Sequence, residues 1–253
     1  MNQFSAHDAK MMALAIRLAE KGQYTTSPNP NVGCVITRPE GDIIGQGWHK
    51  KAGTPHAEIH ALAQAGDKAQ GATAYVTLEP CNHHGRTGPC SQALLKAGIK
   101  RVIAAMVDPN PLVAGSGLKT LSDAGVDVSS GLLESAAKAL NRGFIKRMQT
   151  GQPYITVKLA SSLDGKTALN NGLSQWITGP LARQDVQRHR AKSCAILSGS
   201  GTVLADNPSL NVRHSELGYA SNDISADELR QPTRILLDGR NQMHPDFHLF
   251  SLS

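Results

Sequence analysis

The chain has 253 residues, of which 40% are hydrophobic and 18% charged, and its formal net charge is +6 at pH 7. This length exceeds that of most single domains and favours two. No apolar run approaches the roughly 18 residues that a membrane-spanning helix needs, so we expect a soluble protein.

The amino-terminal residues are polar and lead into a helix-like stretch without the apolar core of a secretory signal, which predicts a cytoplasmic location. In that reducing compartment the four cysteines are expected to be metal ligands, nucleophiles or core residues rather than disulfides. The positive charge suits nucleic acid and phosphorylated small ligands equally well. Because aromatic residues are only 4% of the chain, binding of single-stranded nucleic acid is disfavoured.

The first half of the chain predicts alternating helices and strands. Ser5, with Asp8 three residues later, is typical of a helix start, and apolar residues at helical spacing extend this helix to Lys21. Turn residues at 27–31 then lead into an apolar stretch. We expect strands at 32–37, 43–48, 74–78, 101–107 and 126–129, helices at about 55–65, 89–97 and 132–147, and a glycine-rich turn before the last strand.

This alternation predicts a layered α/β sheet that binds its ligands at the carboxyl ends of the strands. The turn at 150–153 predicts a boundary between one domain at 1–149 and a second at 150–253. For the second domain we expect strands at 154–159, 195–198 and 234–238, a helix at 180–191, and a polar surface loop at 216–228.

Two short motifs carry the chemistry: His56-Ala57-Glu58, and a loop that runs from Pro80-Cys81 to Pro89-Cys90. One imidazole and two thiolates leave the fourth position of a tetrahedral zinc open, as a catalytic site requires. We therefore predict His56, Cys81 and Cys90 as metal ligands. Thr54 and Pro55 favour a helix start that puts His56 and Glu58 in the first turn.

Glu58 is predicted to be catalytic rather than a ligand. Zinc-activated water can attack an electron-poor ring carbon that bears an amine, and Glu58 can carry the proton from the water to the leaving nitrogen. Zinc nucleobase deaminases use an H-x-E motif followed by P-C-x-x-C. In this chain the two cysteines are nine residues apart instead of three.

Other interpretations of these residues stay open. A structural zinc would recruit a fourth protein ligand, which His60, His83 or His84 could supply. The polar loop at 82–89 predicts contacts to a polar or phosphorylated substrate. Cys34 and Cys194 are predicted to be packing residues.

With these motifs the chain resembles a known family, the bifunctional riboflavin-biosynthesis deaminase/reductases (RibD). The resemblance covers essentially the whole chain. It is carried by PNPNVG at 28–33, HAE at 56–58, PCNHHGRTGPC at 80–90, KLASSLDGK at 158–166 and GTVLADNPSLNVR at 201–213.

The resemblance implies a cytidine-deaminase-like three-layer α/β/α domain at 1–149 and a dihydrofolate-reductase-like α/β domain, in part, at 150–253. It also implies zinc-dependent deamination of a phosphoribosylated diaminopyrimidinone, followed by NADPH-dependent reduction of the ribose to a ribityl chain, in a homo-oligomer. The positions matched to NADPH binding are Ala160, Trp176, Thr202 and Asp206. Those assigned to substrate are Ser174, Arg190, Leu210 and Arg213 in the second domain and Asn29, His83 and Arg86 in the first.

One departure from the family pattern matters. The family's reductase continues past the position of Ser253 through further strands and a glycine-rich turn that contacts the dinucleotide phosphates. A polypeptide of only these residues is therefore expected to deaminate its substrate but to reduce it poorly.

Two rival functions share the zinc motifs. A deaminase acting on a base in nucleic acid would use the same chemistry, but it has no role for a reductase-like second half. A non-catalytic module stabilised by zinc would keep the ligands without needing Glu58 as a proton carrier.

Overall fold

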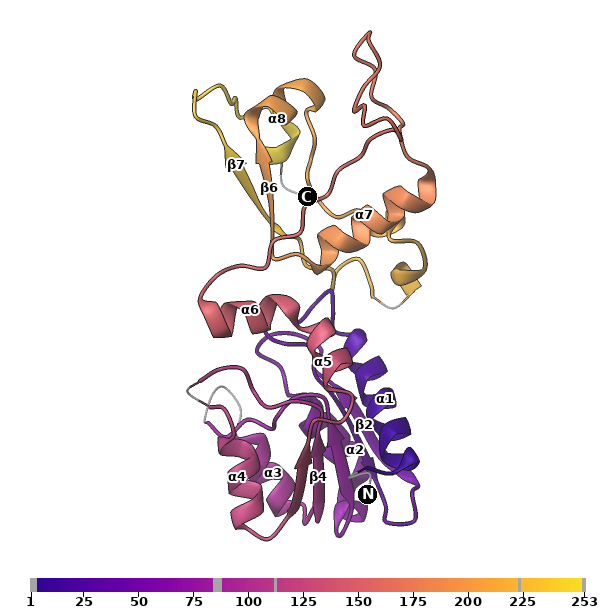
Figure 1. The fold of residues 1–253 in the computed structure, drawn as a ribbon, viewed down its shortest axis with the longest axis vertical. Helices are drawn as coiled ribbons and strands as arrows, with labels where there is room; N and C mark the ends of the chain where they lie inside the picture. Colours follow the sequence, from indigo (N-terminus) through magenta and orange to yellow (C-terminus); the bar gives the residue numbers. More distant parts are fainter. Residues whose placement is uncertain (1–3, 84–87, 112, 223, 252–253) are drawn as a thin grey trace. The chain divides into compact units, whose positions relative to one another are not determined.

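The computed structural model describes residues 4–83, 88–111, 113–222 and 224–251. The chain divides into two compact units, Met1–Tyr154 and Ile155–Ser253 (Figure 1). Each unit has its own sheet and its own buried residues. Among the described residues, no helix is both long and apolar enough to cross a membrane.

A five-stranded sheet forms the centre of the first unit, in the order β2-β1-β3-β4-β5. β1 is antiparallel to both β2 and β3, whereas β3, β4 and β5 are mutually parallel. The sequence predicted a strand at each of these places, although β3 and β4 end earlier than expected. The strands are β1 (Gly33–Thr37), β2 (Ile43–Trp48), β3 (Thr73–Val76), β4 (Arg101–Ala104) and β5 (Asp127–Ser130).

Helices cover both faces of this sheet, because successive strand residues point to opposite faces and both faces are apolar. On β1, Cys34 and Ile36 pack with α2, α3 and α4, while Val35 packs with α1 and α5. Figure 1 shows α1 on one side of the sheet and α3 and α4 on the other. The helices are α1 (Ala6–Glu20), α2 (Ala57–Ala65), α3 (Cys90–Lys96), α4 (Ser116–Asp123), α5 (Glu134–Leu140) and α6 (Arg142–Thr150).

Helix α1 begins as the sequence predicted. The Ser5 hydroxyl accepts from the Asp8 backbone N–H at 3.0 Å, and the Asp8 carboxylate accepts from the Ser5 N–H at 2.8 Å. These two bonds form a capping box, which satisfies backbone donors that the first helical turn leaves without partners. Asp8 is also buried, so its carboxylate reaches the sheet as well as the helix end.

The single helix expected at 132–147 is wrong, because the structure has α5 and α6 with a break at Asn141. The Asn141 amide forms two hydrogen bonds with the backbone of Asn31, at 2.7 and 2.9 Å, and the Asn31 side chain donates to the Leu140 carbonyl. A side-chain amide that bonds distant backbone in this way competes with continuous helix. Helix α4 was also missed, since the glycines around 115–117 predicted only a turn.

The second unit contains a two-stranded parallel sheet of β6 (Ala195–Gly199) and β7 (Thr233–Leu237). Its helices are α7 (Pro180–Lys192), which the sequence predicted, and α8 (Ser200–Asp206), which it did not. Short 3-10 turns cover His214–Glu216, Gly218–Asn222 and His248–Phe250.

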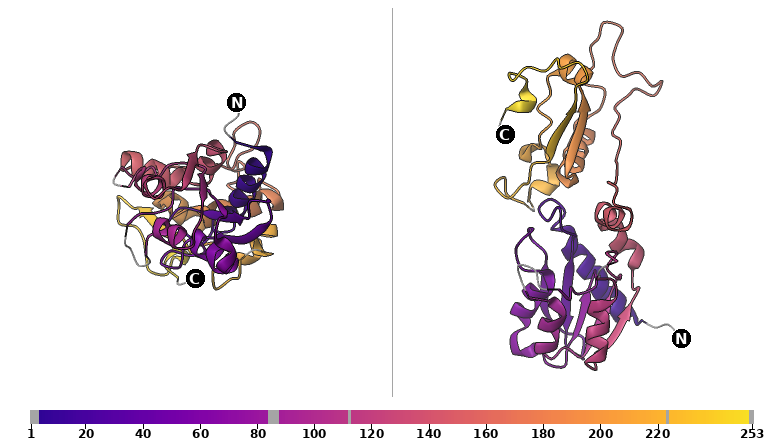
Figure 2. Two further views of the ribbon diagram at one scale, coloured as in Figure 1. Left: turned by 90° about the horizontal axis from the view of Figure 1, so that it is seen from below. Right: turned by 90° about the vertical axis from the view of Figure 1, so that its left-hand side faces the viewer.

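Two expectations for this unit are wrong. The stretch 154–159 is not a strand: it is exposed and pairs with no strand in the part of the chain that the structure describes, and Figure 2 shows the chain there without a strand arrow. The stretch 216–228 is not simply a surface loop, because Leu217, Ala220 and Ile224 are buried. The polar and acidic residues of this stretch predicted exposure, although the apolar residues among them are buried.

Candidate metal and catalytic site

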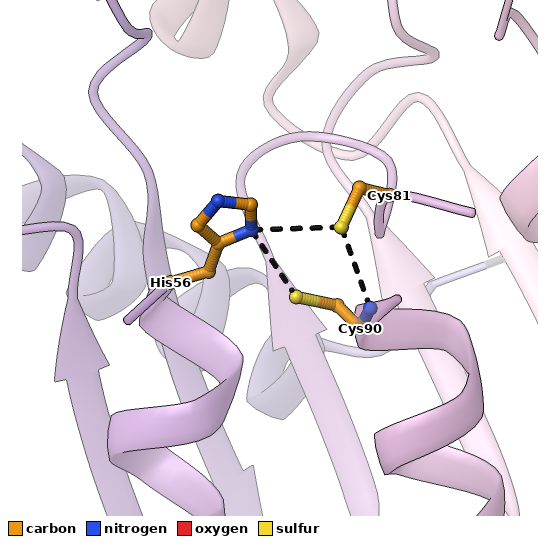
Figure 3. A group of neighbouring side chains, drawn as sticks. All are labelled: His56, Cys81 and Cys90. Carbon is orange, nitrogen blue, oxygen red and sulfur yellow. Dashed lines mark hydrogen bonds between the residues drawn. The ribbon is translucent and has the colours of Figure 1, made fainter. Parts of the chain in front are cut away.

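Three predicted metal ligands lie together in the first unit. The Nδ1 atom of His56 is 3.5 Å from the Cys81 sulfur and 3.3 Å from the Cys90 sulfur, and the three ligand atoms all lie within 4.8 Å of one another. Figure 3 shows the imidazole edge directed toward both sulfurs, with Cys90 at the start of a helix. Among the described residues this is the one grouping of three or more such side chains.

Three different elements deliver these ligands. His56 is the N-cap of α2, Cys81 follows the carboxyl end of β3, and Cys90 is the first residue of α3. The prediction that His56 lies in the first helical turn is wrong, because the helix starts at Ala57. His56 has an extended backbone, and Figure 3 shows its ring beyond the start of α2.

Close packing of α2 on the sheet sets how far His56 and Glu58 lie from the sheet. Gly47 of β2 lies directly under the helix: a Cβ atom at this position would be 2.3 Å from the carbonyl oxygen of Ala57. No side chain tolerates such an overlap with backbone, so only glycine lets α2 approach this closely.

The donor set fits zinc. With Zn–S bonds near 2.3 Å and Zn–N bonds near 2.0 Å, a tetrahedral ion separates an imidazole nitrogen from a sulfur by about 3.6 Å. The two N–S separations of 3.5 and 3.3 Å are close to this value. Two soft sulfur ligands and one imidazole also favour zinc over magnesium or calcium, which prefer oxygen.

The two thiols differ in acidity in the metal-free chain. A hydrogen bond from Cys90 lowers the pKa of Cys81, and the bond from His56 lowers it further against the opposing effect of burial. The same pairing, together with burial, raises the pKa of Cys90. The backbone N–H at the start of α3 also donates to the Cys81 sulfur at 3.3 Å, which favours the thiolate.

Glu58 is buried beside this cluster, in the first turn of α2. Burial raises its pKa to about 7, while its own backbone N–H opposes the shift and the neighbouring Cys81 adds to it. A carboxyl group that titrates near neutral pH can both accept and release a proton under physiological conditions.

His49 was missed in the sequence, although it lies at the site. Its ring is buried and meets the His56 ring edge to face, with centroids 5.3 Å apart. Nδ1 is 3.2 Å from the Pro55 carbonyl, so Nδ1 donates and Nε2 accepts from the Asn29 amide, also at 3.2 Å. Burial lowers the pKa of His49, which favours this neutral form. Its position directly after β2 was the available signal, since site residues follow strand ends.

Of the residues assigned to substrate in the first unit, the structure describes Asn29 and His83. Asn29 is linked to the site by the hydrogen bond between its side-chain amide and His49. His83 is exposed and lies near Asp108. Burial raises the pKa of Asp108, and the nearby His83 opposes this shift. His84 and Arg86 lie outside the described residues.

In the second unit, Arg190 and Arg213 lie close enough to repel. Burial, and then the charge of Arg213, lower the pKa of Arg190. Arg190 donates to the Asn211 carbonyl, next to the buried Leu210, and Arg213 forms an ion pair with Glu216. Ser174 is half-buried on a separate segment.

The residues matched to NADPH binding lie on different segments of this unit. Ala160 is half-buried on the extended stretch, Trp176 is exposed with the Arg183 guanidinium 4.5 Å from its ring centre, and Thr202 and Asp206 are exposed on α8. Of the two cysteines predicted to pack, Cys34 is fully buried but Cys194 is exposed, so that prediction is wrong for Cys194.

Known protein families match each unit. A family model described as the cytidine and deoxycytidylate deaminase zinc-binding region matches residues 5–106, and the model of the RibD C-terminal domain matches residues 153–253. Fold and site thus define a deaminase-type zinc-binding domain joined to a RibD-type, dihydrofolate-reductase-like domain. The fold class expected from the sequence is confirmed.

Relatives extend over nearly the whole chain. RibD of Escherichia coli is 59% identical over 94% of this chain and 65% of its own length, and RibD of Haemophilus influenzae is 56% identical over 99% and 67%. A solved structure from Thermotoga maritima matches with a TM-score of 0.86 and 40% identity, over 96% of this chain and 67% of its own. The chain belongs to the RibD family of riboflavin-biosynthesis proteins, and it spans about two thirds of the length of these relatives.

Proposed function

We propose that the first unit catalyses zinc-dependent hydrolytic deamination of 2,5-diamino-6-(5-phosphoribosylamino)pyrimidin-4(3H)-one in riboflavin biosynthesis. The Thermotoga maritima relative is named a diaminohydroxyphosphoribosylaminopyrimidine deaminase and 5-amino-6-(5-phosphoribosylamino)uracil reductase. The observation that carries the proposal is the grouping of the His56, Cys81 and Cys90 ligand atoms within 4.8 Å, beside the buried carboxyl of Glu58.

The residues at the site suit this reaction. Zinc held by the three ligands would act as a Lewis acid that lets water react at neutral pH. Glu58 takes a first proton from the attacking water and passes it to the adjacent ring nitrogen, and it then carries the second proton from the resulting hydroxyl to the amino nitrogen. The water oxygen becomes the carbonyl oxygen of the product, the carbon–nitrogen bond breaks, and ammonia leaves. A pKa of about 7 suits Glu58 to both halves of this transfer.

Polar groups around the ligands would bind the rest of the substrate. The Asn29 amide, held by His49, is suited to hydrogen bonding with the pyrimidine ring. His83 is exposed two residues after Cys81 and can meet a phosphate. This environment favours a small polar substrate over the alternatives of a base within nucleic acid or a purely structural zinc.

Ammonia release from the purified, zinc-loaded chain tests the proposal. We expect ammonia from the phosphoribosyl diaminopyrimidinone but not from cytidine, adenosine or a single-stranded oligonucleotide, and we expect exhaustive chelation to stop the release. Ammonia from the oligonucleotide, with affinity that falls steeply as salt rises, would instead favour a nucleic-acid deaminase. A protein that binds zinc and deaminates none of these compounds would support the structural alternative.

We further propose that the second unit is of the NADPH-dependent reductase type. The family match at residues 153–253 and the neighbouring Arg190 and Arg213 support the reductase type and a phosphorylated substrate.

NADPH oxidation in the presence of the deaminated product is the corresponding measurement. We expect oxidation faster than that of NADPH alone, and its loss in Arg190→Ala, which removes the proposed phosphate contact. Oxidation no faster than that of NADPH alone, or an equal rate in Arg190→Ala, would contradict this proposal.

A further inference from the structure

We propose that helix α4, which carries no metal ligand, positions the Cys81 sulfur for zinc, and that Asn82, Ser91 and Thr120 are positioning residues for the metal. This inference rests on the zinc binding proposed above. It adds a role for a helix that the sequence did not predict, and it explains how two ligands separated by a long loop keep a fixed geometry.

The start of α4 is hydrogen-bonded to the segment just before Cys81. Glu79 is buried at the end of β3, and its carboxylate accepts four backbone N–H groups. A buried carboxylate is stable only with such donors, so these bonds hold the start of α4 against the end of β3. The donors are Asp108 and Gly115 at 3.0 and 2.9 Å, and Gly117 and Leu118 at 2.8 and 3.3 Å.

The same two segments meet backbone to backbone. A Cβ atom on Gly117 would lie 1.9 Å from the carbonyl oxygen of Pro80, the residue that precedes Cys81. The first turn of α4 therefore rests directly on the backbone that leads to the ligand. Any movement of this helix turn would be passed to Cys81, because no flexible side chain separates the two.

A side-chain bridge then runs from α4 to both cysteines. The Asn82 amide nitrogen donates to the Thr120 hydroxyl at 2.9 Å, and the Ser91 hydroxyl donates to the Asn82 amide oxygen at 2.7 Å. Asn82 follows Cys81 and Ser91 follows Cys90. The Ser91 backbone N–H also donates to the Cys81 carbonyl at 3.1 Å.

These hydrogen bonds reduce the conformational entropy that the segment between Cys81 and Cys90 would lose on metal binding. The chain between the cysteines would need to order itself on metal binding if its ends were free, and that ordering costs conformational entropy. With the ends held by Asn82, Ser91 and Thr120, the two sulfurs are already close in the folded chain. These hydrogen bonds should therefore raise the affinity for the metal as well as the stability of the folded chain.

The test measures zinc affinity of the full chain by competition with a chromophoric chelator, and the absorption spectrum of the Co²⁺-substituted protein. Thr120→Val removes the acceptor on α4 and keeps the shape, while Ser91→Ala removes the donor beside Cys90. We expect roughly 10-fold to 100-fold weaker zinc binding in each, as for other residues that orient ligands, and an altered Co²⁺ spectrum. The double variant should bind zinc about as weakly as the single variant with the lower zinc affinity, because both residues act through Asn82.

Two variants serve as controls. Thr120→Ser keeps the hydroxyl, and Ser122→Ala removes a hydroxyl from the exposed side of the same helix; both should bind zinc as the parent does. Parental affinity and spectrum in Thr120→Val and Ser91→Ala would overturn the inference, even if both variants unfold more easily. Ser91→Ala decides the case if Thr120→Val does not fold. A parent chain that binds no zinc would overturn the proposed function as well.

Discussion

Replacing Glu58 with glutamine should abolish ammonia release while zinc stays bound. Glutamine has nearly the same shape as glutamate, but it cannot carry a proton between water and the leaving nitrogen. General acid–base groups typically contribute about 10²-fold to 10⁴-fold to a rate, and we expect a loss in this range. Because the three ligand atoms come from His56, Cys81 and Cys90, the metal content should not change.

The measurement pairs ammonia release with zinc content for the parent, Glu58→Gln and a matched control. Glu40→Gln makes the same change at an exposed position in the first unit and should retain parental activity. Loss of zinc from Glu58→Gln would mean that Glu58 helps to hold the metal. Full activity would mean that another group transfers the proton.

Replacing Asp8 with asparagine should destabilise the first unit by about 3 kcal/mol, the low end for a broken buried ion pair. The Asp8 carboxylate accepts from the Tyr75 hydroxyl at 2.9 Å and from Arg101 at 3.0 Å, and it completes the capping box of α1. The Arg101 side chain keeps 30% of its surface exposed, which limits the loss. Asparagine removes the charge that all three partners use.

The same group makes stability depend on pH. Burial alone would raise the pKa of Asp8, but the bonds from Ser5, Tyr75 and Arg101 outweigh it and lower the pKa. The unfolded chain therefore binds a proton to this group at a higher pH than the folded chain does. The contribution of Asp8 is fully present above its ordinary pKa of about 3.9 and is lost as the pH falls through the folded value. The difference between parent and Asp8→Asn should shrink over that acidic range.

Urea unfolding followed by fluorescence gives this measurement for the first unit alone. The chain has two tryptophans, so a Trp176→Phe background leaves Trp48 of β2 as the only reporter. Asp127→Asn is the control, because Asp127 pairs with the same Arg101 at 3.3 Å but is 68% exposed, and exposed pairs contribute about 1 kcal/mol or less. Equal effects of the two substitutions, or a constant difference across pH, would contradict the role given to Asp8.

Local patterns in the sequence predicted much of the first unit. The Ser5–Asp8 spacing predicted the start of α1, and apolar stretches predicted every strand of its sheet. The predictions failed where a distant contact decides the local structure. Asn141 breaks the expected helix because it bonds Asn31, which lies 110 residues earlier. The stretch at 154–159 has a strand-like sequence but pairs with no strand among the described residues.

The sequence by itself was enough to predict His56, Cys81 and Cys90 as metal ligands and Glu58 as a proton carrier, because the chemistry of these residues lies in their side chains and their short motifs stand near predicted helix starts. Only the tertiary structure decided how those side chains are held. Glu79 meets α4 across 38 residues, and Asp8 meets Arg101 across 93. The partners of a buried polar group depend on how distant segments pack, and local spacing does not record that packing.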